Sequence, residues 1–254
     1  MNGLELALAP LVIVGSWALL VPLAGVGAPR WSRAVALGGV GLALAAGLSL
    51  IGEPLLAVGG PLGGEALVVD RLGLALELLV LVALAVLVAV EAPGPGAGAR
   101  HGLLLLAGAG ALLCVHAGDL STLVAGLELS CLATAGLLWL GRAAGTGAGG
   151  RAGFTWLIGQ GLAAGLLWLG LGLIYGATGT TRLAELGGRV SAVFLRWGAS
   201  AVQAAVDLLH SREPLTGSLL AYSRDAAVHG AAPAMLLIPG LALALVGLLA
   251  RLGA

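Results

Sequence analysis

One acidic residue in a long apolar segment has the clearest potential for chemistry. Glu128 lies inside the largely apolar run from Leu120 to Leu140. A charged side chain at the centre of a membrane helix costs about 2.5–3.5 kcal/mol on insertion scales, so such residues are rare and commonly mark ion or proton pathways. A buried carboxylate can take up and release a proton when its surroundings balance its charged and neutral forms. We therefore predict that Glu128 holds or relays a proton; alternatively, it only hydrogen-bonds a neighbouring helix.

Two further polar residues interrupt or end apolar runs. Glu77 lies within residues 72–90, where a structural pairing and a supporting charge for a proton path are equally compatible with the sequence. His116 stands at the end of an apolar run, which is typical of an interfacial histidine without a specific role. Asp70 precedes the run and is predicted to cap the helix that follows.

Residues 189–210 have an amphipathic pattern that differs from the rest of the chain. At about 100° per residue the polar side chains fall on one face of a helix: Arg189, Arg196, Ser200, Gln203, Asp207 and His210. Such a helix can span a membrane with its polar face turned into a bundle, or lie in the interface with its apolar face down. Because the segment is rich in alanine and carries charges well inside it, we expect the interfacial position.

The composition is that of a polytopic membrane protein. Of 254 residues, 59% are hydrophobic and 9% charged, with a mean hydropathy of +1.08, whereas soluble domains carry about 25% charged residues. No charge run indicates nucleic-acid binding. Spans of about 20 residues are predicted at seven places: residues 4–27, 34–52, 72–91, 102–117, 119–141, 153–175 and 232–250.

An eighth span is the alternative if residues 189–210 cross the membrane. Basic residues gather in the loops that lie inside when the N-terminus is outside, namely Arg30, Arg33, Arg100, Arg142 and Arg151. The predicted fold class is thus an all-α membrane protein with about seven or eight spans and its N-terminus outside.

Signatures of cofactor chemistry are missing from the sequence. There is no Cys-x-x-Cys, His-Glu-x-x-His or Walker motif, and no glycine-rich fingerprint between a strand and a helix. Cys114 and Cys131 lie in apolar runs and are interpreted as small core residues. We therefore expect neither a cofactor nor a metal in this chain.

Three segments carry a resemblance to a known family. They are Asp119-Leu120-Ser121-Thr122-Leu123, Gly126-Leu127-Glu128-Leu129-Ser130 and Leu173 to Thr180. Together they resemble the antiporter-like membrane subunits of proton-translocating NADH–quinone oxidoreductase, respiratory complex I, and in particular its N subunit. The resemblance implies that Glu128 belongs to a membrane-embedded proton path. It also implies a larger relative of fourteen helices with two inverted repeats, of which this chain would hold the first repeat and one closing helix.

The family's buried lysines have no direct counterpart. Where the resemblance places a lysine after the glutamate helix, this chain has Thr155. Arg196 keeps a positive charge at the next basic position, yet arginine stays protonated and is a poor proton relay. The proline that breaks the family's helix is absent, and its next lysine falls near Ala226. The implied proton path is Glu128 and Arg196, with weaker places for Glu77 and Asp207.

The resemblance also implies an organisation and partners. The chain would be one membrane domain over 1–254, with N-terminal helices at 1–101, the family core at 102–187, an amphipathic segment at 188–231 and a closing helix at 232–250. Its partners would be the lipid bilayer and other hydrophobic subunits of a complex I membrane arm.

NADH, FMN, iron–sulfur clusters and quinone would be bound by other subunits, and this chain alone would be inactive. The expected location is a bacterial inner membrane or, alternatively, the mitochondrial inner membrane. Two alternatives stay open: a structural subunit that no longer conducts, and a subunit of a related cation/proton antiporter or membrane-bound hydrogenase.

Overall fold

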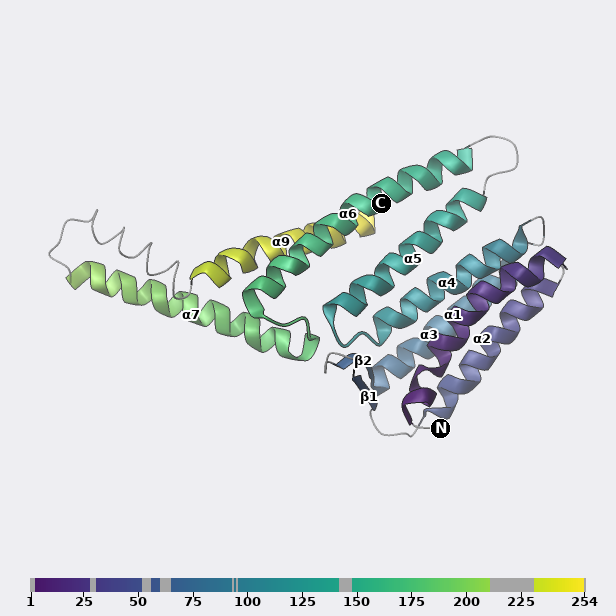
Figure 1. Ribbon diagram of the computed structural model, residues 1–254, viewed down its shortest axis with the longest axis horizontal. Coiled ribbons are helices and arrows are strands. Elements are labelled where there is room, and N and C mark those ends of the chain that lie inside the picture. The colour runs from purple at the N-terminus through teal and green to yellow at the C-terminus, as the bar shows by residue number, and fades with distance from the viewer. Residues whose placement is uncertain are drawn as a thin grey trace. The chain divides into compact units, whose positions relative to one another are not determined.

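Two compact units of helices make up the protein. The structure is a computed structural model that describes residues 3–27, 31–51, 56–59, 65–92, 94, 96–141, 148–210 and 231–253. The first unit is Met1–Gln160 and the second is Gly161–Ala254. The helices, labelled in Figure 1, are α1 (Gly3–Gly27), α2 (Ser32–Ser49), α3 (Arg71–Val90), α4 (Ala97–Val115), α5 (Leu120–Gly141), α6 (Ala148–Thr178), α7 (Leu183–His210) and α9 (Ala231–Gly253).

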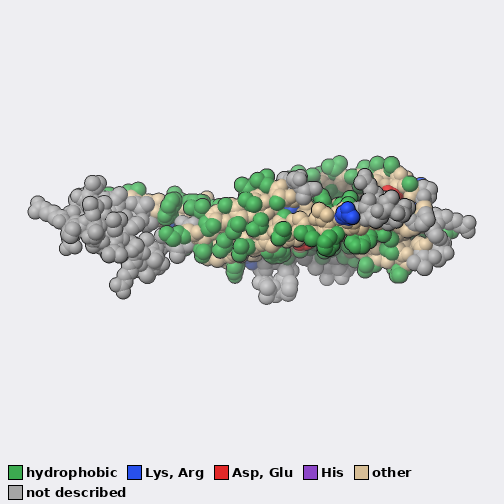
Figure 2. All heavy atoms as spheres, turned by 90° about the horizontal axis from the view of Figure 1, so that it is seen from above, with side chains coloured by type: hydrophobic (Ala, Val, Ile, Leu, Met, Phe, Trp, Pro, Cys, Tyr) green, Lys and Arg blue, Asp and Glu red, His purple; other side chains and the backbone are tan. Residues whose placement is uncertain are grey.

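Six of these helices, α1 to α6, are long and apolar enough to cross a membrane. Helix α9 carries a shorter apolar stretch, Met235–Arg251. Hydrophobic side chains spread over the described surface with few charged ones between them (Figure 2), as expected for helices that face lipid. The prediction of an all-α polytopic membrane fold is confirmed.

The segment at 189–210 is one continuous helix within α7, as predicted. Its apolar residues Phe194, Leu195 and Trp197 are exposed, and so are Arg189 and Arg196 on the other side. Helix α7 is not among the six candidate spans. Its position along the membrane surface stays a prediction.

In the first unit, α1 and α3 both pack against α2 and α4, and α5 packs on α4. Figure 1 shows these helices side by side. Their buried faces meet in one apolar core, formed chiefly by Val14, Val21, Val40, Leu81, Leu84, Val88, Leu105 and Leu112. Burial of such side chains from different helices fixes the bundle that positions the polar residues described below.

Glycines bring α4 and α5 into close contact. A Cβ added to Gly126 would lie 2.7 Å from the carbonyl oxygen of Gly110, and one added to Gly110 would lie 2.6 Å from that of Gly126. Ser130 donates a hydrogen bond to the carbonyl of Ala107 across the same contact, at 3.0 Å. Small residues that let helix backbones approach closely are the usual basis of helix association in lipid.

The second unit repeats this principle. Helix α9 lies against the later part of α6, where a Cβ on Gly170 would come within 2.5 Å of the backbone nitrogen of Ala244. A Cβ on Gly247 would come within 2.8 Å of the carbonyl of Ala163. Helix α7 also contacts α9.

A short β-hairpin joins α2 to α3 and was not predicted. Strands β1 (Leu56–Gly59) and β2 (Glu65–Val69) pair antiparallel. Strand β2 also bonds the α4–α5 connection, because the amide of Val68 donates to the carbonyl of His116 at 2.8 Å and the amide of Gly118 donates to that of Ala66 at 2.9 Å. We call this the hairpin end of the bundle. The sequence signal was a glycine- and proline-rich stretch at 59–64 between two short apolar runs.

Helix α4 begins at Ala97, earlier than the predicted start at residue 102. The prediction excluded Arg100 and His101 from the apolar helix because both are polar. The structure accommodates them inside the first turns, where Arg100 pairs with Glu91 and His101 contacts Ser32. Polar side chains that find partners on α2 and at Glu91 therefore extend the helix beyond its apolar run.

The glycine contact between α4 and α5 leads to a first prediction. Gly126→Ala is expected to destabilise the bundle by about 1–3 kcal/mol, because overpacking forces the two backbones apart. The matched control is Gly41→Ala on α2, where an added Cβ meets nothing within 4 Å and alanine favours the helix by about 0.8–1.0 kcal/mol. Thermal unfolding in mild detergent measures both; equal midpoints for the two variants would contradict the packing argument.

A second prediction concerns Asp119, which precedes α5. Its carboxylate accepts hydrogen bonds from the Thr122 amide at 2.7 Å and the Ser121 hydroxyl at 2.5 Å. Burial raises the pKa of Asp119, but the hydrogen bonds from Ser121 and Thr122 together lower it below the usual 3.8. The stabilisation is therefore complete above the pKa of the unfolded chain and is lost as pH falls through the lower folded value.

Asp119→Ala should accordingly destabilise the start of α5 by about 0.5–2 kcal/mol, the usual loss for a helix cap. The difference from the native chain should shrink as pH falls below 3.8. The hydrogen-exchange rate of the Thr122 amide measures this difference in local stability. Asp119→Asn is the control, because asparagine can cap the helix without a charge; a pH response retained in that variant would assign it to another group.

Candidate functional site

Glu128 lies on α5 and is partly buried. On a helix it shares a face with Cys131 and Ala135, which lie about one and two turns further along. That face meets the first part of α6, because Cys131 Sγ lies 3.5 Å from Gln160 Oε1 and a Cβ on Gly153 would come within 3.1 Å of the Ala135 carbonyl. Glu128 therefore sits on the side of α5 that packs toward α6, away from the glycine contact with α4.

Gln160 is a buried polar residue that the sequence analysis did not single out. Its side chain is 4% exposed, and Nε2 has no hydrogen-bond partner within the part of the chain that the structure describes. A buried amide donor without a partner is unfavourable by about 1–3 kcal/mol, which makes it a place where water or another polar group is expected. An amide inside an apolar span was the signal available in the sequence.

The remaining residues of the predicted proton path are spread over the fold. Arg196 is exposed on α7, in the second unit, and Asp207 lies in the same helix with its side chain outside the described residues. Thr155, at the position where the resemblance places a lysine, is exposed on α6. The part of Arg196 and Asp207 in proton transfer stays a prediction, and Thr155 was not assigned one.

Glu77 forms a buried pair that sequence reasoning left open. Its Oε2 lies 2.6 Å from Nε2 of His116, and the two side chains are 1% and 5% exposed. Glu77 lies about 9 Å along α3 from the first helical residue at 1.5 Å per residue. The structure thus shows that Glu77 is paired, and its place in a proton path stays a prediction. His116 is not an exposed interfacial residue, because it closes α4 beneath strand β2.

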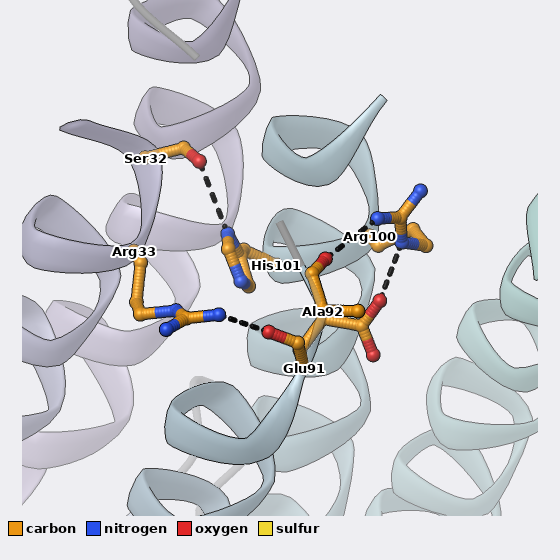
Figure 3. A network of polar contacts seen from close by, with 6 residues as sticks. All are labelled: Ser32, Arg33, Glu91, Ala92, Arg100 and His101. Atoms are coloured by element: carbon orange, nitrogen blue, oxygen red, sulfur yellow. Dashed lines mark hydrogen bonds and ion pairs between the residues drawn. The ribbon is translucent and has the colours of Figure 1, made fainter. Parts of the chain in front are cut away.

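The opposite end of the bundle holds a second polar cluster (Figure 3). Arg100 Nε pairs with Glu91 Oε1 at 2.6 Å, and its guanidinium also donates to the carbonyl of Ala92 at 3.0 Å. Arg33 donates to the backbone carbonyl of Glu91 from the other side. His101 Nδ1 lies 3.2 Å from the Ser32 hydroxyl, and its Nε2 has no partner among the described residues.

These clusters define what the bundle can do chemically. His101 and His116 lie about 22 Å apart along α4 at 1.5 Å per residue, near its two ends, and Glu128 lies inside α5. All twelve Lys and Arg residues of the sequence are arginine. Because arginine stays protonated, the carboxylates and histidines among these groups are the ones that can exchange protons. In the described ranges, no group of three or more His, Cys, Asp and Glu could hold a metal ion.

The fold is similar to chains of two solved respiratory membrane complexes. One belongs to respiratory complex I from Thermus thermophilus, with TM-score 0.61 and 22% identity over 94% of this chain and 43% of that chain. The other belongs to the membrane-bound sulfane sulfur reductase, an archaeal respiratory membrane complex, with TM-score 0.65 and 17% identity over 96% of this chain and 44% of that chain. The chain thus spans less than half the length of either. No protein-family model and no curated protein matches the sequence. The chain has the fold of membrane subunits found in respiratory complexes.

Proposed function

We propose that this chain is a membrane-arm subunit of a proton-translocating respiratory complex of the NADH:quinone oxidoreductase type. The observation that carries the proposal is a fold match over more than nine-tenths of the chain to subunits of two respiratory membrane complexes. The independent resemblance around Asp119 to Ser130 points to the same class, within the antiporter-like subunits and the N subunit in particular.

Glu128 is the proposed proton carrier of this subunit. It lies inside an apolar candidate span, Leu120–Leu140. An ionisable group is energetically costly there and therefore commonly marks a functional site. Glu128 also shares a helix face with Cys131, whose Sγ lies 3.5 Å from the buried amide of Gln160 on α6. Electron transfer in other subunits would change the protonation of Glu128 and so move a proton within the membrane.

The redox chemistry belongs to the partners in this proposal. NADH, FMN, iron–sulfur clusters and quinone would be bound by other subunits. The exposed apolar side chains of α1, α3 and α6 would face lipid and neighbouring hydrophobic subunits in a bacterial inner membrane or, alternatively, a mitochondrial one.

Two alternatives are favoured by specific observations. The replacement of a family lysine by Thr155, which is exposed, favours a structural subunit that keeps the fold and no longer conducts protons. The fold match to a sulfane sulfur reductase, an archaeal respiratory membrane complex, favours a place in a respiratory complex that oxidises another donor; a related antiporter or membrane-bound hydrogenase belongs to the same alternative by the sequence resemblance.

The proposed assembly predicts co-purification. An affinity-tagged chain, expressed from its own locus and extracted in mild detergent, should bring down other hydrophobic subunits together with NADH-oxidising activity. Recovery with a complex that oxidises another donor would favour the second alternative. Recovery of a monodisperse chain alone would contradict membership of a larger complex.

The proposed role of Glu128 predicts a defect in pumping without a defect in assembly. Glu128→Gln keeps the shape and hydrogen bonding but removes the titratable proton. It should slow proton transfer through this subunit by about 10²-fold, the low end for a positioned proton-transfer group. The ratio of protons to electrons, measured in vesicles containing the complex, should fall.

Glu185→Gln is the matched control, because Glu185 pairs with Arg182 at 2.9 Å and lies outside the candidate spans. It should leave the ratio unchanged. An unchanged ratio in Glu128→Gln, with normal assembly, would instead support the structural subunit.

A further inference from the structure

The pair of Glu77 and His116 has a hydrogen-bonding pattern that leaves one proton free to move. His116 Nδ1 lies 3.3 Å from the carbonyl oxygen of Val68. A carbonyl oxygen only accepts hydrogen bonds, so Nδ1 carries a proton. The contact of 2.6 Å between His116 Nε2 and Glu77 Oε2 then requires one proton between them, on nitrogen or on oxygen. The pair has no net charge in either case, and the proton can change sides within a single hydrogen bond.

The other carboxylate oxygen of Glu77, Oε1, is a second atom of the pair that could take up a proton. Oε1 is buried and has no hydrogen-bond partner among the residues that the structure describes. It faces the backbone of α2, where a Cβ on Gly47 would lie 2.6 Å from it. A buried acceptor left unpaired is unfavourable in a purely structural ion pair, whereas the unpaired oxygen of a carboxyl group that takes up and gives back a proton is left without a partner only in the ionised form.

Asp70 lies on the aqueous side of the pair and would pass protons between solution and His116. It is exposed at the start of α3, and its Oδ1 accepts a hydrogen bond from the Gly73 amide at 2.5 Å. A Cβ on Gly73 would lie 2.9 Å from Asp70 Oδ1 and 3.2 Å from His116 Nδ1, so the two side chains flank the same glycine. These three side chains therefore form a series that begins at exposed Asp70, continues with His116 and ends at the buried carboxylate of Glu77.

The surroundings of the pair contribute backbone rather than competing charge. Strand β2 contributes the Val68 carbonyl, α2 contributes the backbone at Gly47, and α3 contributes Asp70. Within the contacts given for the described residues, Asp70 is the charged neighbour of the pair. No arginine takes part in these contacts, so no permanent positive charge fixes the proton on one partner.

We propose that Asp70, His116 and Glu77 form a proton-binding site at the hairpin end of the bundle, which takes up protons from the adjacent aqueous phase through Asp70 and releases them to it by the same route. With the N-terminus outside, as the arginine distribution predicts, this phase is the outer one. The site is separate from Glu128, and its proton binding needs no partner subunit. The proposal therefore stands or fails independently of the complex to which the chain belongs.

Infrared difference spectroscopy of the full-length chain in lipid nanodiscs tests the site. In a Glu128→Gln background, which removes the other proposed proton carrier, a change of pH should produce a carboxyl signal from a buried group, and adding Glu77→Gln should abolish it. In that variant the amide of residue 77 can donate to neutral His116, so the bundle should keep its structure. Glu185→Gln is the control with an unchanged signal. A buried-carboxyl signal retained when Glu77→Gln is added would show that the pair is a static bridge and would overturn the proposal.

The proposed role of Asp70 is tested by measuring the rate at which the carboxyl signal changes. After a rapid pH jump, Asp70→Asn should slow the carboxyl signal at least several-fold while preserving its amplitude, because asparagine can still cap α3 but cannot relay a proton. An unchanged rate would remove Asp70 from the site. If Glu77→Gln fails to fold, ¹⁵N-imidazole spectra of the native chain decide the question: one buried histidine should show a protonated Nδ1 and a pH-dependent Nε2, and shifts that stay constant for every buried histidine would overturn the proposal.

Discussion

Inside hydrocarbon a polar group must find its partner within the protein, and this constraint determines most of the structure. The helices satisfy their own backbones, and the hairpin satisfies its second strand on the α4–α5 connection. In the described part of the first unit, two polar clusters lie at the ends of the bundle, one around Glu77 and His116 and one around Glu91 and Arg100, while Glu128 and Gln160 lie within the candidate spans. Even the place where α4 begins follows from this, because its first turn can contain Arg100 only where Glu91 receives it.

Close packing by glycine decides where these polar groups meet. Without a hydrophobic force between helices in lipid, association depends on shape and on a few hydrogen bonds. Gly47 shows the connection directly, because a side chain there would collide with the Glu77 carboxylate. Gly73 does the same for Asp70 and His116. The small residues that hold the bundle together thus also provide the room in which carboxylate and imidazole come into contact.

The sequence predicts the parts of this fold that depend on local pattern. Apolar runs of sufficient length gave the spans, and the polar stripe of residues 189–210 gave α7. The sequence does not predict pairings between distant residues. Glu77 and His116 are 39 positions apart, and no periodicity indicates that α3 lies against the end of α4. The same reason explains His116, because a histidine at a helix end looks interfacial until β2 covers it. The hairpin was missed although its turn had a recognisable composition, since a membrane protein led us to look for spans alone.

The absence of lysine changes what proton transfer in this chain requires. Arginine can attract or orient a carboxylate, but it does not give up its proton, so Arg196 cannot replace a lysine as a relay. Proton transfer in the described bundle would therefore rely on carboxylates, histidines and water. The described bundle provides such groups inside α5, at Glu128, and at the hairpin end, at Glu77 and His116. The lack of lysine in this sequence does not by itself exclude proton transfer in the bundle, because a glutamate and a histidine that share one proton can pass it between them while the pair keeps no net charge.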